Sequence, residues 1–353
     1  MFRCLFHAPL SKPAMSKAPA DPQKAAHFAG LEYVSDEAPG LGRSGGNGRF
    51  RFVGAKGKPV RDRSTLARIR RLAIPPAWKK VWIAASADAH LQATGRDARG
   101  RKQYLYHPDF AAVRDAAKFS RLVEFAQTLP AIRRRIRRDL KREGLPREKI
   151  LAAVVSLLEE TLIRVGNEDY ARANNSFGLT TLRNRHAKVR GAEMRFLFRG
   201  KSGKEWSLSL RNRRVAKVVR SCQELPGQQL FEYRNGDGSI HRLTSSDVNA
   251  YLREISGRDI TAKDFRTWAG TVKAAMGLLG ADAPPSKRLV REIVAAVAEE
   301  LGNTVAVCRK CYIHPRLLAD FEAGTLKLQM PARGRGGLDR AEVAVLNYLK
   351  RVK

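Results

Sequence analysis

Two cysteines and a histidine near the end of the chain have a spacing that could bind a metal. Cys308 and Cys311 form a C-x-x-C pair, and His314 follows three residues later. No second pair lies nearby to complete the tetrahedron that structural zinc requires, so no metal site is expected here. Tyr312 follows Cys311 directly, which leaves a thiol and a phenol side by side as candidate nucleophiles.

Other side chains that could act on a polyanion stand in separate short segments. Arg164 follows an apolar helical stretch, Lys201 lies in a basic turn that contains glycine, and Arg266 lies in a further segment. Each is commonplace alone, but the segments around them resemble, in this order, the active-site segments of the poxvirus-type and bacterial type IB DNA topoisomerases. These segments are LIRVGNEDY (162–170) with FGLTTL (177–182), FRGK (198–201), KDFRTW (263–268), and LGNT (301–304) with KCY (310–312). Three N-terminal segments also resemble that family: LAIPPAW (72–78), QATGRD (92–97) and GRKQY (100–104).

The resemblance implies a mechanism for cutting a phosphodiester. Tyr312 is the implied nucleophile, and its attack gives a 3′-phosphotyrosyl bond and a free 5′-hydroxyl. Arg164 and Arg266 are implied to hold the non-bridging oxygens, where a metal acts in other nucleases. Lys201 is the implied general acid that protonates the leaving 5′-oxygen. The bond energy is kept, so religation is expected to need no ATP, and the sequence has no G-x-x-x-x-G-K-[ST] loop.

One position departs from the poxvirus pattern. Many relatives have a histidine nine residues before the tyrosine, where this chain has Asn303. The implied role is a hydrogen bond to a non-bridging oxygen, which an amide can donate, although an amide cannot act as an acid or base. The alternative is a turn asparagine beside Gly302. Tyr312 is preferred to Cys311 as the nucleophile, because a cysteine would leave a labile thiophosphate and no histidine base precedes it.

The composition points to nucleic acid. Lys and Arg total 67 against 34 Asp and Glu, a formal net charge of +33 that attracts any polyanion, although structural binding proteins share this property. Duplex DNA is the expected partner, and the matched segments place five expected DNA contacts at Gln92, Arg96, Lys102, Tyr104 and Tyr170, with core packing as the alternative for the two tyrosines.

Cysteine usage and hydropathy bear on the compartment. Four cysteines are too few and too scattered for a disulfide framework, so a reducing compartment is expected. No apolar run approaches the roughly 20 residues that cross a bilayer. The expected location is therefore the cytoplasm, in association with the nucleoid.

The N-terminal third has strand-like patterns, at residues 31–34, 50–53 and 81–83. The segment GLGRSG (40–45) matches G-x-G-x-x-G, but it precedes a strand-like segment and opens no helix, so a flexible surface loop is expected there. Farther along, residues 193–198 and 205–210 alternate in hydrophobicity and predict a β-hairpin around the turn that carries Lys201.

Helical patterns dominate after residue 109. Apolar residues at helical spacing predict amphipathic helices over 150–162 and 289–301, the second ended by Gly302. Residues 131–142 carry seven Arg and Lys, which indicates either a solvated face or a helix that contacts phosphates. A short helix is predicted over 338–349.

These patterns predict an α+β protein. We expect a flexible extension (1–25), a small N-terminal domain containing a β-sheet (26–112), a larger, mainly α-helical catalytic domain with a β-hairpin (113–328), and a C-terminal tail with a short helix (329–353). The resemblance implies that the domains form a C-shaped clamp on DNA, in a monomeric type IB topoisomerase that relaxes supercoils without metal, ATP or another cofactor.

Two alternatives remain. A tyrosine recombinase shares the Arg-Lys-Arg-Tyr constellation and the covalent chemistry, but would more often have a helical arm-binding domain in place of the N-terminal segments. A non-catalytic basic nucleic-acid-binding protein would bind DNA without Tyr312 and would never form a covalent adduct.

Overall fold

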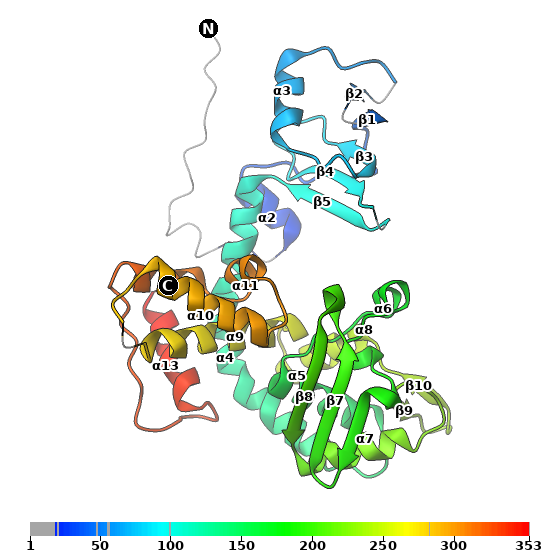
Figure 1. Cartoon of the computed structure of the whole chain (residues 1–353), viewed down its shortest axis with the longest axis vertical. Coiled ribbons are helices and arrows are strands. Elements are labelled where there is room, and N and C mark those ends of the chain that lie inside the picture. Colours follow the sequence, from blue (N-terminus) through cyan, green and yellow to red (C-terminus); the bar gives the residue numbers. More distant parts are fainter. Residues whose placement is uncertain are drawn as a thin grey trace. The chain divides into compact units, whose positions relative to one another are not determined.

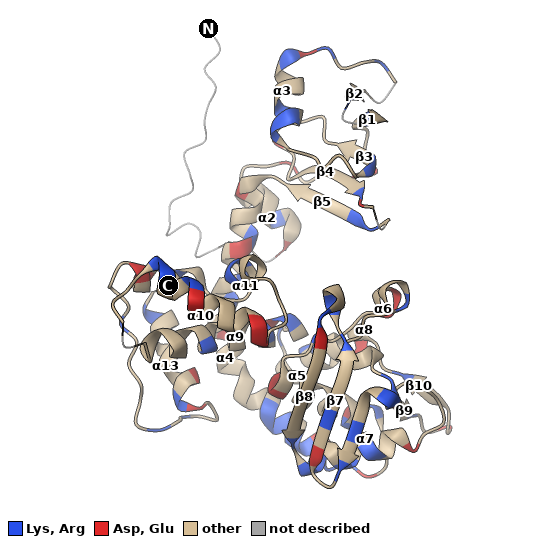
Figure 2. Cartoon of the chain, viewed as in Figure 1, with Lys and Arg blue, Asp and Glu red and all other residues tan. Residues whose placement is uncertain are grey.

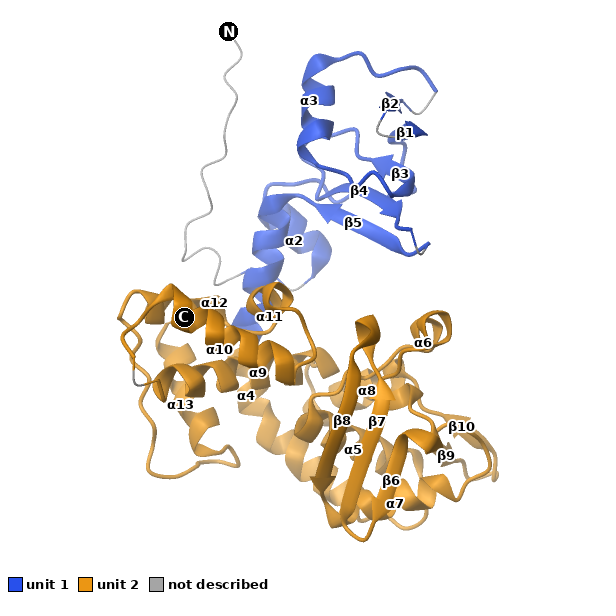
Figure 3. Ribbon diagram, in the orientation of Figure 1, with its two compact units in different colours: residues 1–121 blue, residues 122–353 orange. Residues whose placement is uncertain are grey.

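The computed structural model describes residues 18–19, 21–46, 49–54, 57–98, 100–281 and 283–352. The chain forms two compact units, residues 1–121 and 122–353 (Figure 3). The division lies within helix α4 (Pro108–Asp139), later than the boundary predicted at residue 112, because this helix begins in unit 1 and continues into unit 2. Most of the expected extension (1–25) lies outside the described residues, but its end already belongs to helix α2 (Pro22–Phe28), whose Ala25 is buried.

Unit 1 is built on an antiparallel sheet with the strand order β2-β1-β3-β4-β5 (Figure 1). Its core is formed by Ile83, Val81 and Ala93 of the sheet and Ile69 of helix α3. The predicted strands at 50–53 and 81–83 are confirmed, whereas residues 31–34 contribute only an isolated bridge between Glu32 and Ala89. The bounds are β1 (Leu41–Gly46), β2 (Arg49–Val53), α3 (Arg63–Arg71), β3 (Lys79–Ile83), β4 (Leu91–Arg96) and β5 (Lys102–Tyr106).

The segment expected to be a flexible loop (40–45) instead forms most of β1 and pairs with both β2 and β3. The Arg43 guanidinium donates hydrogen bonds to the carbonyl oxygens of Pro75 (3.1 Å) and Trp78 (2.5 Å) and lies 4.2 Å from the centre of the Phe50 ring. Glycine is also needed just before the strand, because a Cβ on Gly40 would lie 2.2 Å from the Trp82 indole. The segment is therefore a structural strand.

Unit 2 is mainly helical, with small antiparallel sheets β6-β7-β8 and β9-β10 (Figure 1). Its helices after α4 are α5 (Arg147–Thr161), α6 (Glu168–Asn174), α7 (Arg213–Gln223), α8 (Ser245–Ser256), α9 (Ala262–Leu279), α10 (Lys287–Glu300), α11 (Val305–Cys311), α12 (Pro315–Glu322) and α13 (Arg340–Arg351). The strands are β6 (Ala187–Arg190), β7 (Glu193–Arg199), β8 (Glu205–Arg211), β9 (Glu232–Arg234) and β10 (Ile240–Arg242), and short 3-10 turns are η1 (Leu179–Thr181), η2 (Asn184–His186) and η3 (Lys201–Gly203). No helix among the described residues is long and apolar enough to cross a membrane.

Helix α5 is the centre of unit 2. The predicted amphipathic stripe is only part of what is buried, since every residue from Ile150 to Leu158 is buried. Small residues such as Ala152 and Ser156 on the other faces let α7, α8 and α9 pack around the helix. Helix α5 is therefore enclosed by its neighbours as far as Leu158, and Arg164 lies three residues beyond its end at Thr161.

The β7-β8 hairpin is confirmed, with Phe198 opposite Trp206 and Arg199 opposite Glu205. Its tip is η3, which begins at Lys201 and has Ser202 in the left-handed region (φ 64°). The predicted helix over 289–301 is confirmed as α10, and Gly302 follows with φ 60°, a conformation that favours glycine.

The C-terminal segment expected to be a tail is part of the core of unit 2. Helix α13 packs on α9, and its Tyr348 hydroxyl donates a buried hydrogen bond to Asp320 (2.9 Å). Glu342 accepts hydrogen bonds from Arg133 (2.8 Å) and from the Trp268 indole (3.1 Å). The hydrophobic pattern over 338–349 predicted this helix, but not its packing partners, because these lie far away in the sequence.

In the basic run at 131–142, some arginines form ion pairs inside unit 2 and others are exposed to solvent. Arg133 pairs with Glu159 (2.7 Å) and Glu342 (2.8 Å), and Arg135 and Arg142 both pair with the buried Asp139 (2.8 and 3.1 Å). These arginines stabilise unit 2, which was neither of the two predicted roles. Other residues of the run, such as Arg138, are exposed, and Figure 2 marks the Lys and Arg positions in blue along the ribbon of this unit.

Candidate active site

Arg164 is held by a loop that folds back on itself. Leu162 ends α5 in the left-handed region (φ 57°), and Gly166 follows at φ 101°. The Arg164 carbonyl accepts a hydrogen bond from the Leu179 amide (2.9 Å), and a Cβ on Gly178 would lie 2.5 Å from that carbonyl oxygen. Only glycine allows this approach, so the two glycines fix the backbone that carries Arg164.

Arg266 lies in the first turns of α9, which begins with a capping box of Thr261 and Asp264. The arginine is only 3% exposed. Its guanidinium donates hydrogen bonds to the carbonyl oxygens of Leu162 and Leu301, the latter at 2.7 Å. Arg266 thus joins the end of α5 to the end of α10.

Asn303 follows α10 and Gly302, and its position depends on Arg164. The Arg164 Nη2 donates hydrogen bonds to the Gly302 carbonyl (3.0 Å) and to the Asn303 Oδ1. The residue is therefore a turn asparagine beside Gly302 and also a neighbour of Arg164, and its implied hydrogen bond to a phosphate oxygen stays a prediction.

Tyr312 ends helix α11, and its backbone lies against α9. The Thr271 hydroxyl oxygen lies 3.4 Å from the Tyr312 carbonyl oxygen and accepts the His314 amide (3.1 Å), and a Cβ on Gly270 would lie 2.6 Å from the same carbonyl oxygen. The Arg266 guanidinium carbon lies 5.1 Å from the centre of the Tyr312 ring. One helix thus positions both Arg266 and the phenol.

A cavity of about 510 Å³ brings the predicted residues together. The Lys201 ammonium, from the hairpin tip, lies 5.7 Å from the centre of the Tyr170 ring. Asn303 does not line the cavity itself and is linked to it through Arg164. The lining includes Arg164, Tyr170, Lys201, Arg266 and Tyr312, together with Lys263, which the sequence analysis did not single out.

The two arginines of the cavity and the neighbouring Asn303 amide have unused donors. Among the described residues, five buried side-chain polar atoms have no hydrogen-bond partner, and three of them are Arg164 Nη1, Arg266 Nε and Asn303 Nδ2. Burial lowers the pKa of Arg164, and it lowers the pKa of Arg266 to about 10, with the nearby Arg164 charge acting in the same direction. Buried donors of this kind cost free energy unless they bind an acceptor, so the site is suited to an anion with several oxygens.

The predicted DNA contacts in unit 1 have different surroundings. Gln92 is 3% exposed, and its amide bonds to the Ala87 and Ala89 carbonyls (2.8 and 2.7 Å) and accepts from Arg68 (3.1 Å). The prediction that Gln92 contacts DNA is therefore wrong in this structure, because its polar atoms are used to hold strand β4.

The other three predicted contacts are accessible. Arg96 lies at the exposed end of β4, with a hydrogen bond to the Gly100 carbonyl (2.8 Å). Lys102 pairs with Asp36 (2.6 Å) and lies 5.6 Å from the centre of the Tyr104 ring. Tyr104 is 47% exposed, so packing in the core does not account for it.

Two members of the predicted C-x-x-C and His314 group, Cys308 and His314, have structural roles. No group of three or more His, Cys, Asp or Glu side chains in the described part of the chain could hold a metal. Cys308 is fully buried, and burial raises the pKa of its thiol to about 11. His314 caps α12, where its Nδ1 accepts the Arg316 amide (3.3 Å).

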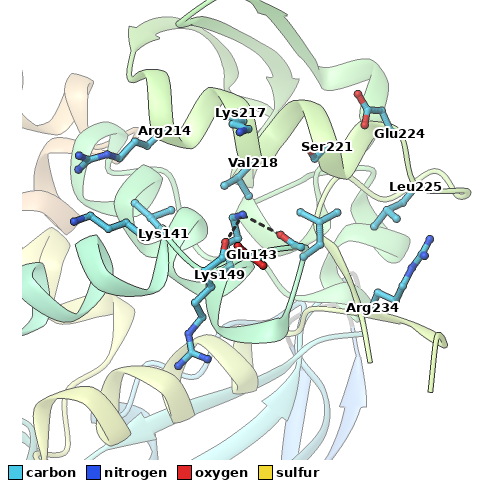
Figure 4. A pocket seen from close by; sticks show the side chains of 14 residues that line it. Lys141, Glu143, Lys149, Arg214, Lys217, Val218, Ser221, Glu224, Leu225 and Arg234 are labelled. Carbon is cyan, nitrogen blue, oxygen red and sulfur yellow. Dashed lines mark hydrogen bonds between the residues drawn. The ribbon is translucent and has the colours of Figure 1, made fainter. Parts of the chain in front are cut away.

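A larger hollow of about 880 Å³, between the α4-α5 loop and α7, is also basic (Figure 4). Its Lys149 ammonium donates to the carbonyls of Arg142 (2.6 Å) and Gly144 (2.9 Å). Arg214 and Arg234 lie at opposite ends of it (Figure 4), and none of its lining atoms is a buried donor without a partner. The cavity around Tyr312 is therefore the candidate active site.

Some residues of the site were missed in the sequence analysis. Lys263 lies one helical turn before Arg266, a spacing that could have indicated it. Thr271 and Trp206 gave no such signal, because their partners, Tyr312 and Gly302, are distant in the sequence.

Comparisons with known proteins identify the family of the chain. Residues 107–330 match the family described as eukaryotic DNA topoisomerase I, catalytic core, and residues 49–97 match the bacterial DNA topoisomerase IB, N-terminal domain. The chain is 31% identical over 259 residues to DNA topoisomerase 1B of Acanthamoeba polyphaga mimivirus, covering 70% of this chain and 77% of the relative. It is 24% identical over 238 residues to DNA topoisomerase 1B of vaccinia virus (strain Copenhagen), covering 64% and 70%. The fold, the cavity and these matches together show that the chain belongs to the type IB DNA topoisomerase family, enzymes whose substrate is DNA.

Proposed function

We propose that this protein relaxes supercoiled duplex DNA by transient cleavage of one strand through Tyr312. The observation that carries the proposal is the set of three buried donors without partners, Arg164 Nη1, Arg266 Nε and Asn303 Nδ2, in the cluster that contains the tyrosine. A phosphodiester supplies the oxygens that these groups lack.

In the proposed reaction the Tyr312 phenolic oxygen attacks the scissile phosphorus, and the bond to the 5′-oxygen breaks. Arg164, Arg266 and Asn303 stabilise the charge on the non-bridging oxygens, which increases in the pentacoordinate transition state. Lys201 donates a proton to the leaving 5′-oxygen. The reverse reaction reseals the strand from the stored phosphotyrosyl bond, so neither ATP nor a divalent metal is required.

We further propose that the protein acts as a monomer whose two units enclose the duplex as a C-shaped clamp, so that DNA rotates about the intact strand. Arg96, Lys102, Tyr104 and Tyr170 remain the proposed DNA contacts outside the catalytic set. Such an enzyme would work at the nucleoid, in the cytoplasm. Because most contacts would be to phosphate, binding should weaken steeply as salt is raised.

The direct test is relaxation of a negatively supercoiled plasmid in EDTA without ATP. We expect the wild type to relax it and Tyr312→Phe to bind the plasmid without relaxing it. A denaturing gel of a nicked oligonucleotide substrate should show a covalent adduct at the 3′ end for the wild type alone. If neither protein relaxes the plasmid or forms an adduct, although both bind it, the protein is a binding module and the proposal is wrong.

A further inference from the structure

The hairpin that carries Lys201 contacts the end of helix α10 through two other residues. The Lys204 ammonium donates a hydrogen bond to the Glu299 carbonyl, at 2.7 Å. The Trp206 indole lies against Gly302, where a Cβ would approach the indole Cζ2 to 2.6 Å. These contacts hold β8 against the segment that precedes Asn303.

The same segment binds both arginines of the site. Arg266 donates to the Leu301 carbonyl (2.7 Å), and Arg164 donates to the Gly302 carbonyl (3.0 Å) and to Asn303. Carbonyls in the last turn of a helix lack intrahelical donors and lie at the negative end of the helix dipole, so they attract cations. The end of α10 therefore connects the arginines with the hairpin.

Trp206 contacts both the hairpin tip and the segment that follows α10. Its ring stacks on Phe198 at 6.0 Å with an interplanar angle of 2°, and it is 9% exposed. A Cβ on Gly200 would lie 2.6 Å from the indole Nε1. The indole thus contacts the residue before Lys201 on one side and, at Gly302, the residue before Asn303 on the other.

We propose that Lys204 and Trp206 are positioning residues that hold the Lys201 ammonium in reach of the leaving 5′-oxygen; this inference rests on the proposed function. In the step concerned, the bond from the Tyr312 oxygen to phosphorus forms and the bond from phosphorus to the 5′-oxygen breaks. The Lys201 proton passes to the 5′-oxygen, and the phenol proton passes to solvent. A hairpin released from α10 would slow only the proton transfer from Lys201.

The experiment compares two oligonucleotide substrates in single-turnover cleavage at saturating protein. One has the natural 5′-oxygen at the scissile bond, and the other has a bridging sulfur there, which leaves as a thiolate and needs little protonation. The variants are Lys204→Met, Lys204→Arg and the control Lys188→Met. Lys188 is an exposed lysine on β6 of the same sheet, so its replacement removes the same charge.

We expect Lys204→Met to cleave the oxygen substrate about tenfold more slowly than the wild type, and the sulfur substrate within about twofold of it. Lys204→Arg should retain most of the activity, because it can still donate to the Glu299 carbonyl, and Lys188→Met should match the wild type. Trp206→Phe, which keeps the stacking on Phe198 but removes part of the ring against Gly302, should show the same dependence on the substrate.

Equal slowing of Lys204→Met on both substrates, or no slowing, would overturn the inference. Lys201→Ala serves as the reference for the proposed function. If Lys201→Ala cleaves the oxygen substrate at the wild-type rate, Lys201 is not the general acid and the proposed function is at fault. If Lys201→Ala shows the sulfur rescue and Lys204→Met does not, only the positioning role fails.

Discussion

Arg164 and Asn303 are joined by a hydrogen bond from the guanidinium Nη2 to the amide Oδ1, and this bond determines which atom of the amide is left as an unused donor. Because the oxygen is used by Arg164, the Nδ2 donor is left without a partner. In this orientation the amide offers a donor, as its proposed role toward a phosphate oxygen requires. With the amide reversed, the oxygen would take the place of that donor.

The first prediction concerns this amide. Asn303→Asp keeps an acceptor for Arg164 but replaces the donor with a charged oxygen, so single-turnover cleavage should fall by roughly 10²–10³-fold. Asn303→His should retain much of the activity. Asn235→Asp, at an exposed turn after β9, is the matched control for the added charge. Wild-type cleavage by Asn303→Asp would show that Nδ2 does not contact the phosphate.

The second prediction concerns the fork geometry of Arg266. A lysine at this position keeps the charge, but its donors all lie on one nitrogen and cannot reproduce the planar fork that reaches the carbonyls of Leu162 and Leu301 with two separate nitrogens. Arg266→Lys should slow cleavage by roughly 10²–10³-fold without a comparable loss of DNA binding, measured by fluorescence anisotropy. Arg253→Lys, an exposed position on α8, is the control. Equal losses in cleavage and binding would assign Arg266 to binding alone.

The third prediction concerns Gly270, which lies against the backbone carbonyl of Tyr312. A methyl group at this position would lie 2.6 Å from the Tyr312 carbonyl oxygen, so the tyrosine backbone must shift. Gly270→Ala should therefore reduce the cleavage rate roughly 10–100-fold, because small displacements of a reacting group have large effects on rate. Gly280→Ala, at the end of the same helix with its nearest neighbour at 3.4 Å, should be neutral. Unchanged cleavage by Gly270→Ala would mean that the contact does not position Tyr312.

The fourth prediction concerns the C-terminal helix. Glu342→Ala would leave Arg133 without its main buried partner, and we expect the free energy of unfolding of unit 2 to fall by about 3 kcal/mol in urea denaturation. Glu292→Ala breaks an exposed pair with Arg288 and should cost less than about 0.5 kcal/mol. A loss for Glu342→Ala no larger than for Glu292→Ala would indicate that α13 is a dispensable tail.

The fifth prediction concerns acid stability. Burial lowers the pKa of His186 and of His314 to about 4, from an ordinary value of 6.5. Between these values the unfolded chain binds more protons than the folded one, so stability should fall as pH drops from 6.5 towards 4, by up to about 1.4 kcal/mol per pH unit for each histidine.

The double variant His186→Asn with His314→Asn should show a flatter decline of the unfolding midpoint between pH 7 and pH 5. Asparagine can still accept the amide hydrogen bonds of Arg183 and Arg316. His241→Asn, at an exposed position on β10, should decline as steeply as the wild type. A double variant with the same slope as the wild type would contradict the assignment.

The sequence by itself determined the residues of the site and several local elements. The segments around Arg164, Lys201, Arg266 and Tyr312 were sufficient to indicate the family, since each is contiguous. The β7-β8 hairpin and α10 with its Gly302 stop could also be predicted, because alternation, helical spacing and turn residues are local properties of the chain.

Only the tertiary structure decided which polar side chains form hydrogen bonds or ion pairs within the protein and which keep donors for a substrate. The pattern around Gln92 did not show that its amide is used inside unit 1, and the basic run did not show that Arg133 pairs with Glu342. The burial of α5 on all sides and the docking of α13 also depend on packing partners far along the chain. Hydrogen-bond satisfaction is a property of neighbours in space, so only the folded chain shows that Arg164, Arg266 and Asn303 each keep one buried donor without a partner.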